Sequence, residues 1–163
     1  MTYSADDILH ILETVPDPEI PVLSVVDLGI IRHINILDDD TVEVSITPTY
    51  SGCPAMGVIE LEIKAALAAN GIKKFVVKTQ LSPPWTTDWM SESGKEKLKT
   101  YGIAPPVDET QHLQLFGKEL QVECPLCHSK NTHLVSRFGS TACKALYQCD
   151  DCLEPFDYFK CLR

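Results

Sequence analysis

The sequence predicts an α+β protein: a small mixed β-sheet with helices on one face, followed by a small cysteine-rich module. Helix-like and strand-like hydrophobic patterns alternate over the first two thirds of the 163 residues. Six of the seven cysteines lie after residue 123. A proline-containing stretch, residues 104–111, separates the two regions. We therefore predict an α/β domain over residues 1–106, a linker over 107–118 and the cysteine-rich module over 119–163.

The first predicted elements are a helix and a β-hairpin. Ser4 can cap a helix in which apolar residues recur with helical spacing, and Pro16 helps to end it. Residues 30–37 and 41–47 are strand-like runs that flank three consecutive aspartates. Because aspartate favours turns, the two runs predict a hairpin.

The remaining elements of this domain are two helices with a strand between them. Residues 54–69 place apolar side chains on one stripe of a helix that Asn70-Gly71 ends. Residues 72–81 form a strand-like run, and residues 94–101 predict a short helix. This order of elements favours a small mixed sheet with helices packed on one face.

Composition and charge exclude several classes of protein. Hydrophobic residues make up 44% of the chain, which indicates a folded protein. The net charge is −9 and the sequence has no stripe of lysine and arginine, so we expect no nucleic-acid partner. No apolar run reaches the roughly 18 residues of a membrane span, and Met1–Asp7 lacks the features of a secretion signal. We expect a cytoplasmic protein without a membrane partner.

The strongest motif is a pair of Cys-x-x-Cys sequences in the cysteine-rich module. Two residues between thiolates let both sulfurs of a tight turn face one ion, and two such turns supply the tetrahedral ligands of structural zinc. About 45 residues cannot bury enough apolar surface to fold alone, so the module needs such a metal. We predict a zinc ribbon held by four thiolates: Cys124, Cys127, Cys149 and Cys152. Iron in place of zinc, and two metal-free reduced pairs, are the alternatives.

Two further cysteines, Cys143 and Cys161, remain in this module. Cys143 follows the small residues Gly139–Ala142, whose backbone amides could approach an anion or another metal centre. Lys144 beside it would favour the thiolate. We therefore consider Cys143 a candidate for iron or cluster transfer and Cys161 an accessory thiol, with ordinary packed cysteines as the alternative.

A second motif is the loop Thr47–Pro54, between a predicted strand and a predicted helix. Pro54 suits the first helical turn, which would place Cys53 near the helix N-terminus, where the dipole and free amides lower the pKa of a thiol. Such a thiolate is a good nucleophile and soft-metal ligand. Four hydroxyl-bearing residues would support it: Thr47, Thr49, Tyr50 and Ser51.

The alternative for this loop is a capping turn with a packed cysteine. One cysteine is also too few to hold a metal cluster. If Cys53 does bind a cluster, further ligands must come from a partner subunit, a second motif or a client protein.

A third motif is the acidic, proline-flanked loop Asp17–Pro21. The prolines fix an extended loop, and Asp17 and Glu19 could bind a hard cation or a backbone amine. Capping of the loop is the alternative that the chemistry favours. The sequence contains no Gly-rich phosphate loop, Gly-x-Ser-x-Gly elbow or His-Glu-x-x-His motif. We therefore expect a chain that is not itself an enzyme.

Several of these motifs together resemble known families. Four segments are similar to the iron–sulfur assembly domain of SufT-like proteins: Asp17–Pro21, Asp27–Gly29, Thr47–Pro54 and Pro84–Trp85. Two tail segments narrow the resemblance: Phe138–Leu146 and Glu154–Cys161. They resemble the PaaD (also called PaaJ) family, auxiliary proteins of the ring-epoxidising phenylacetyl-CoA oxygenase.

The resemblance implies a factor that matures the metal centres of this oxygenase in aerobic phenylacetate degradation. It implies that Cys53 is the reactive thiol, that Asp17 and Glu19 belong to the signature loop, and that the ribbon cysteines are ligands. Zinc would be structural, and iron or an iron–sulfur cluster would be held transiently. The clients would be the reductase with its iron–sulfur cluster or the catalytic subunit with its di-iron site, and the chain could form a homodimer. The alternative is a non-catalytic structural subunit of the oxygenase complex.

Overall fold

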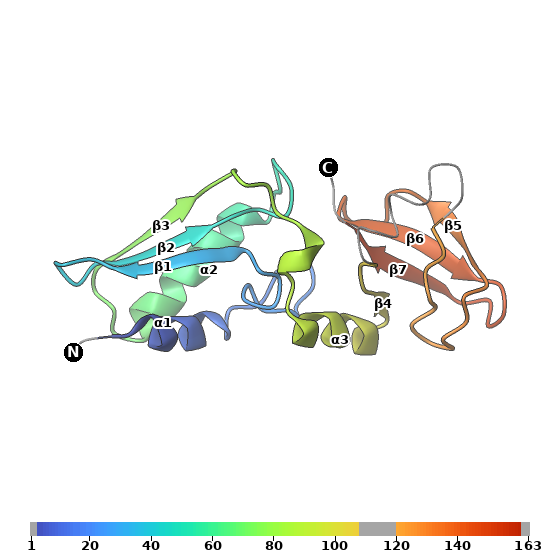
Figure 1. Cartoon of the computed structure of the whole chain (residues 1–163), viewed down its shortest axis with the longest axis horizontal. Helices are drawn as coiled ribbons and strands as arrows, with labels where there is room; N and C mark the ends of the chain where they lie inside the picture. Colours follow the sequence, from blue (N-terminus) through green and yellow to red (C-terminus); the bar gives the residue numbers. More distant parts are fainter. Residues whose placement is uncertain (1–2, 108–119, 161–163) are drawn as a thin grey trace. The chain divides into compact units, whose positions relative to one another are not determined.

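The computed structural model describes residues 3–107 and 120–160 and divides into two compact units, Met1–Gly94 and Lys95–Arg163. Figure 1 shows the elements of each unit. The division falls before residue 106, because the short strand β4 (Ile103–Ala104) pairs with a strand of the second unit. Almost all of the predicted linker lies outside the described residues.

The first unit contains a three-stranded mixed sheet in the order β1-β2-β3 (Figure 1). Strands β1 (Ile31–Ile36) and β2 (Val42–Ile46) form the predicted antiparallel hairpin. Strand β3 (Phe75–Thr79) pairs parallel to β2. A parallel pair needs a crossover connection, which helix α2 (Met56–Ala69) supplies.

The core of this unit lies between the sheet and two helices. The alternating residues Val42, Val44 and Ile46 of β2 are fully buried, as the period-two pattern of that strand requires. Ile59, Ile63 and Leu67 form the buried stripe of α2. The helices contact each other and the sheet, so they cover one face, as predicted.

Helix α1 (Ala5–Leu12) begins with a capping box. The backbone N–H of Asp7 donates to the Ser4 hydroxyl, and the backbone N–H of Ser4 donates to the Asp7 carboxylate at 2.8 Å. This pair satisfies helix N–H groups that have no partner within the helix. The predicted cap at Ser4 is confirmed, and the helix ends at Leu12, before the prolines.

The tryptophan-containing segment packs into the first unit. The indole N–H of Trp85 donates to the Leu28 carbonyl at 2.8 Å, and its ring is buried. The 3-10 turn η1 (Thr87–Trp89) follows, with the Arg32 guanidinium 3.4 Å from the centre of the Trp89 ring. Helix α3 (Glu92–Tyr101) begins here.

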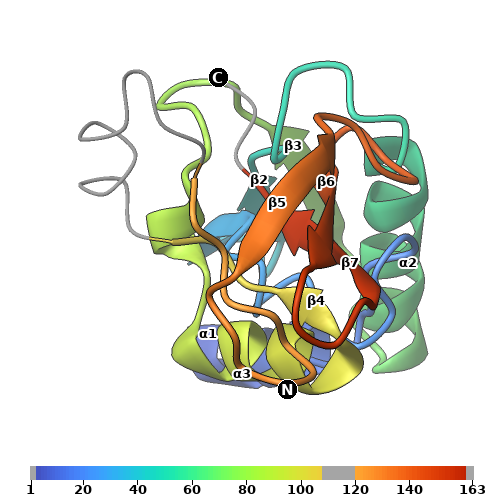
Figure 2. The ribbon, with the colours of Figure 1, turned by 90° about the vertical axis from the view of Figure 1, so that its right-hand side faces the viewer.

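The second unit contains a four-stranded sheet in the order β4-β7-β6-β5. Strands β5 (Thr132–Ser136), β6 (Lys144–Cys149) and β7 (Pro155–Phe159) pair antiparallel, side by side in Figure 2. Tyr147 stacks on Phe156 and meets Tyr158 edge-on at the centre of its core. Among the described residues, no helix has the length and apolar character that crossing a membrane requires.

Candidate metal centre and cysteine loop

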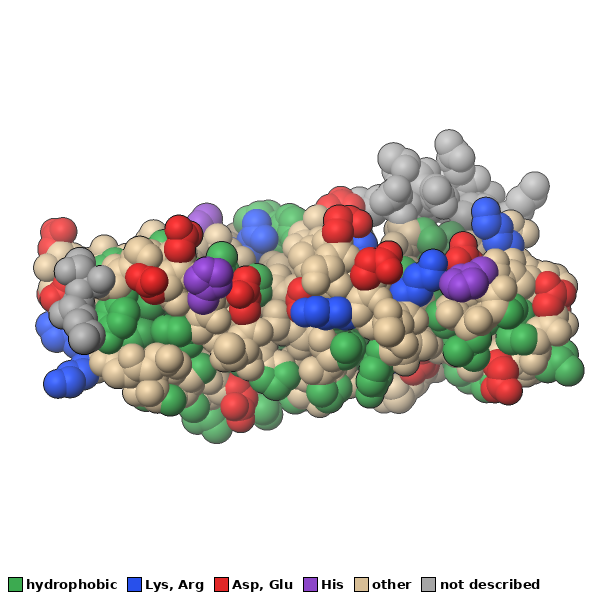
Figure 3. Space-filling view, turned by 90° about the horizontal axis from the view of Figure 1, so that it is seen from below, with side chains coloured by type: hydrophobic (Ala, Val, Ile, Leu, Met, Phe, Trp, Pro, Cys, Tyr) green, Lys and Arg blue, Asp and Glu red, His purple; other side chains and the backbone are tan. Residues whose placement is uncertain are grey.

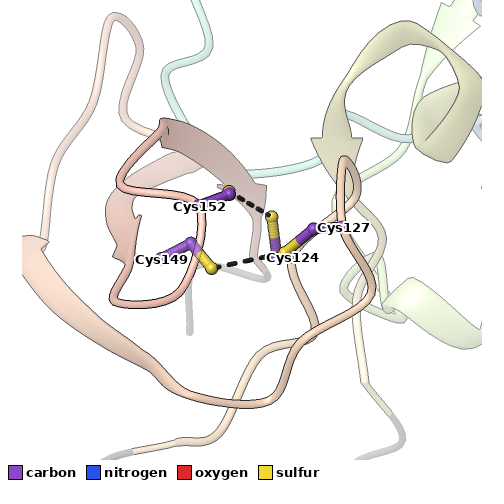
Figure 4. A group of neighbouring side chains, drawn as sticks. All are labelled: Cys124, Cys127, Cys149 and Cys152. Carbon is purple, nitrogen blue, oxygen red and sulfur yellow. Dashed lines mark hydrogen bonds between the residues drawn. The ribbon is translucent and has the colours of Figure 1, made fainter.

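The two Cys-x-x-Cys sequences of the second unit converge on one point (Figure 4). All four sulfurs lie within 4.8 Å of one another. Cys124 and Cys152 are 3.8 Å apart at their sulfurs, and Cys127 and Cys149 are 3.5 Å apart. A disulfide bond would bring two sulfurs to about 2.05 Å, so the cluster consists of four thiols facing one another.

These distances fit a tetrahedral metal ion. Zinc–sulfur bonds of about 2.3 Å at tetrahedral angles place neighbouring sulfurs about 3.8 Å apart. The two measured sulfur pairs lie at or just inside that spacing. The cluster therefore has the donor atoms and the size that a structural zinc ion requires. It leaves no fourth position for a reacting water, so the site is built for stability rather than catalysis.

Each Cys-x-x-Cys turn is closed by a residue in the left-handed backbone conformation. His128, directly after Cys127, has φ 62°, and Leu153, directly after Cys152, has φ 63°. The backbone N–H of the next residue then donates to a sulfur: that of Ser129 to Cys127, and that of Glu154 to Cys152. Sequence reasoning missed the left-handed conformation, because neither position holds a glycine.

Backbone N–H groups adjust the acidity of the thiols. The N–H groups of Cys152 and Asp151 donate to the sulfur of Cys149 and lower its pKa to about 7. The N–H of Ser129 acts in the same direction on Cys127, but burial and the neighbouring sulfurs outweigh it and raise the pKa of Cys127 to about 12. The thiols of the cluster thus differ in acidity, and metal binding requires each ligand thiol to lose its proton.

A polar clamp joins the two turns outside the sulfur cluster. We define it as Ser129, Asn131 and Asp151: both Ser129 and Asn131 donate side-chain hydrogen bonds to the Asp151 carboxylate. The backbone N–H of Asp150 also donates to the Asn131 carbonyl at 2.8 Å. The sequence analysis did not anticipate this clamp, because an acidic residue inside a Cys-x-x-Cys turn is also typical of a solvated surface.

The two histidines of this region are bonded elsewhere. The Nδ1 of His128 lies 3.1 Å from the Glu123 carboxylate, and the Nδ1 of His133 lies 2.9 Å from the Asp150 carboxylate. Within the described residues, the ligand-type group at this centre consists of cysteines alone.

Cys53 lies on the loop between β2 and α2 and is half-buried. Its N–H donates to the Tyr50 carbonyl, and its own carbonyl accepts from Met56. These bonds form a turn that ends where the helix begins. Helix α2 starts at Met56 rather than at Pro54, so Cys53 precedes the first helical turn instead of adjoining it.

The hydroxyl-bearing residues of this loop differ in exposure. Thr47 is buried, and its Oγ1 has no hydrogen-bond partner in the described structure. Thr49 and Tyr50 are half-buried, and Ser51 is exposed. Gly52 beside Cys53 has φ 83°, and a side-chain carbon built there would meet nothing within 4 Å. The loop therefore has open space at Gly52, the residue before Cys53.

The Asp17 carboxylate caps its own loop. Asp17 is buried, and its Oδ1 accepts from the N–H groups of Glu19 at 2.9 Å and Ile20 at 2.7 Å. This is the capping role that the chemistry of the sequence favoured. Glu19 is half-buried in the same loop.

Cys143 lies at the start of β6 and is 6% exposed. Its sulfur is 3.1 Å from the Thr141 hydroxyl, and its carbonyl accepts from the N–H of Lys160. Cys143 belongs to the second unit and Cys53 to the first. Cys161 lies outside the described residues.

The surface carries both signs of charge. Figure 3 shows one face, on which carboxylates are interspersed with lysine, arginine and histidine side chains. On this face of the described residues the basic groups form no continuous stripe.

Comparisons with known proteins match both units. The family described as "Iron-sulfur cluster assembly protein" matches residues 5–77, and the one described as "PaaD zinc beta ribbon domain" matches residues 108–160. The chain is 49% identical over 156 residues to an Escherichia coli (strain K12) protein named as a subunit of 1,2-phenylacetyl-CoA epoxidase. That match covers 96% of this chain and 92% of the relative.

Two further relatives match the first unit. An "Fe-S protein maturation auxiliary factor" of Porphyromonas gingivalis is 36% identical over 94 residues, which cover 57% of this chain and 89% of the relative. The crystal structure of a domain of unknown function from Bacillus anthracis is 28% identical, with a TM-score of 0.54, and the match covers 57% of this chain and 89% of that one.

Proposed function

The chain belongs to the PaaD family, and from this membership we propose that it is an auxiliary factor that matures metal centres of the phenylacetyl-CoA epoxidising oxygenase. The proposal joins two matches: a relative named for that epoxidase over nearly the whole chain, and relatives named as iron–sulfur maturation factors over the first unit. The role is auxiliary rather than catalytic.

We propose that the second unit is a zinc ribbon in which the metal is structural. Cys124, Cys127, Cys149 and Cys152 would hold the ion, and their spacing supports this assignment. Zinc supplies folding free energy to a module with a small core. The clamp and the backbone N–H groups then keep the ligands oriented.

We propose that Cys53 is the thiol that handles iron or an iron–sulfur cluster as cargo. The observation that carries this proposal is its position: a half-buried cysteine that follows the exposed residues Ser51 and Gly52 of its loop, just before a helix. Cys143 is a weaker candidate, because its burial blocks direct transfer. Asp17 acts as a loop cap, and Glu19 is the other acidic residue of that loop.

A single thiolate supplies one ligand, so the cargo needs others from a second copy of the chain or from the client. Transfer is then a ligand exchange. A client side chain binds the iron as the bond between iron and the Cys53 sulfur breaks, and the released thiolate takes a proton from water. The oxidation state of the iron does not change.

The test is the iron content of the clients. Co-expression of Cys53→Ser with the oxygenase and its reductase should reduce the iron in one of them by about tenfold, while the zinc content of the chain stays the same. Ser93→Ala, at an exposed position of the first unit outside this loop, is the control. Fully metallated clients with Cys53→Ser would exclude this role for the thiol.

The second candidate is a structural subunit of the oxygenase, which the subunit name of the Escherichia coli relative favours. Such a subunit would copurify with the oxygenase in fixed stoichiometry. Activity of the complex would then be unaffected by Cys53→Ser. A maturation factor would instead leave the mature complex.

A further inference from the structure

Three basic side chains gather at the loop that joins β5 to β6, here called the Arg137–Cys143 loop. The Lys160 ammonium donates to the Arg137 carbonyl and lies 4.2 Å from the centre of the Phe138 ring. Burial lowers the pKa of Lys160, and the charge of Arg137 lowers it further. The Lys144 ammonium donates to the Ser140 hydroxyl at 3.3 Å. The chain is acidic overall, so this concentration of positive charge calls for an explanation.

Lys144 is the most unusual of the three. It is only 7% exposed, and among the described residues no carboxylate forms an ion pair with it. Asp157, whose carboxylate lies beside Gly139, forms no ion pair with Lys144, Lys160 or Arg137 in this part of the chain. A buried ammonium without an ion pair at contact distance is unfavourable. The hydrogen bond to one neutral hydroxyl, with the Asp157 carboxylate near the Lys144 side chain, compensates it only in part.

The backbone of the loop is shaped to approach a ligand. Gly139 donates its N–H to the Lys144 carbonyl at 2.8 Å, and a side-chain carbon there would lie 2.9 Å from the Asp157 carboxylate. Glycine at this position lets the Asp157 carboxylate lie close to the backbone of the loop. The next three N–H groups, of Ser140, Thr141 and Ala142, donate to no backbone acceptor in the described structure. Successive N–H groups of this kind make a concave site for an anion.

The Ser140 hydroxyl connects the buried charge to the surface. Its oxygen accepts from the Lys144 ammonium, so its own proton is available to donate outward. Ser140 and Arg137 are exposed, and the neighbours Thr141 and Ala142 are half-buried. An anion on the loop would thus meet a hydroxyl polarised by Lys144, backbone N–H groups and the Arg137 guanidinium.

We propose that the Arg137–Cys143 loop binds a phosphate group. A phosphate dianion offers several acceptor oxygens to donors that converge from different directions, and it neutralises more than one cation. A carboxylate would leave part of this charge uncompensated. The phosphate can be inorganic or part of an organic phosphate such as coenzyme A. This site uses neither the ribbon cysteines nor Cys53, and it does not depend on the function proposed for them.

The test is calorimetric titration of the full-length, zinc-loaded protein in phosphate-free buffer at low salt. The probes are inorganic phosphate, coenzyme A and pantetheine, which lacks phosphate. Lys144→Met removes the buried charge, and Ser140→Asp places a carboxylate on the loop at a position that does not threaten folding. Lys130→Met is the control, because this substitution removes one positive charge at an exposed position elsewhere in the module.

We expect both phosphate probes to bind and pantetheine to give no heat. Lys144→Met and Ser140→Asp should each weaken binding by about tenfold or more, and added salt should weaken it as well. Tighter binding of coenzyme A than of inorganic phosphate would identify an organic phosphate as the ligand, and equal binding would identify the phosphate group alone. Absence of heat with both phosphate probes, pantetheine binding as tight as that of coenzyme A, or an equal loss with Lys130→Met would each overturn the proposal.

Discussion

The side-chain amide of Asn131 donates to the Asp151 carboxylate at 3.0 Å, which ties the two Cys-x-x-Cys turns together without any sulfur. The Ser129 hydroxyl donates to the same carboxylate. These bonds, with the left-handed residues His128 and Leu153, help to hold the two turns in place beside the sulfur cluster. Hydrogen bonds within the protein chain therefore contribute to the positions of the two Cys-x-x-Cys turns in the ribbon.

Loss of the clamp should loosen the metal while all four ligands remain. Asp151→Ala removes the acceptor of two hydrogen bonds, and outer contacts of this kind alter metal affinity by about 10–100-fold. We expect zinc to pass to a chromophoric chelator at least several times faster than from the wild type. Glu154→Ala, a nearby exposed carboxylate, should behave like the wild type. Equal release rates for the two variants would show that the clamp does not support the site.

Removal of the metal should unfold the second unit alone. Structural zinc contributes about 10–16 kcal/mol of apparent binding free energy, which exceeds what a small aromatic core supplies. Cys149→Ser, or a strong chelator, should unfold strands β5–β7, so that the amide signals of their residues lose their chemical-shift dispersion in an NMR spectrum. Both tryptophans belong to the first unit, so their fluorescence should not change. A simultaneous change in tryptophan fluorescence would show that the units do not fold separately.

Two glycines near Cys53 should respond to alanine in opposite directions. Gly52 has φ 83°, a conformation that costs an L-residue about 1–2 kcal/mol, so Gly52→Ala should destabilise the first unit by about that amount. Gly57 lies in α2 with open space around it, so Gly57→Ala should stabilise it by about 0.5–1 kcal/mol. Urea unfolding followed by tryptophan fluorescence measures both. The same sign for the two variants would contradict the assigned backbone conformations.

The capping box of α1 should make the first unit sensitive to acid. The N–H and hydroxyl of Ser4 hold the pKa of Asp7 below its ordinary value of 3.8. The carboxylate therefore stabilises the fold fully above pH 3.8, and this contribution disappears as the pH falls through the lower pKa of the folded state. An NMR titration of the Asp7 side chain should show a midpoint below 3.8, and Ser4→Ala should raise it. A midpoint at or above the ordinary value would exclude the cap.

The sequence predicted the elements better than their ends. The alternation in β2 and the apolar stripe of α2 are periodic signals that burial confirms. Strand β4 was missed, because two residues carry no period and the strand exists only through pairing with β7. The start of α2 was placed too early, because Pro54 suits a first turn but the Cys53 carbonyl accepts from Met56 instead.

The metal centre was predictable and the surrounding bonds were not. The spacing of the four cysteines is a local pattern with a known geometric meaning. The burial of Lys144 depends on β6 and the loop that folds back on it, which no local pattern encodes. The capping role of Asp17 lay within the chemistry of its own loop and needed only the backbone geometry to establish it.

The order β1-β2-β3 puts the strand that leads into the Cys53 loop at the centre of its sheet. Hydrogen bonds on both sides hold the end of β2: Thr47 donates to Ile30, and Gln80 donates to Ile46. Thermal opening of a sheet starts at its outer strands, where amide protons exchange first. The backbone at the base of the loop will thus be among the last parts of the sheet to open. The Cys53 thiol therefore stays attached to a stable strand while the outer strands open locally.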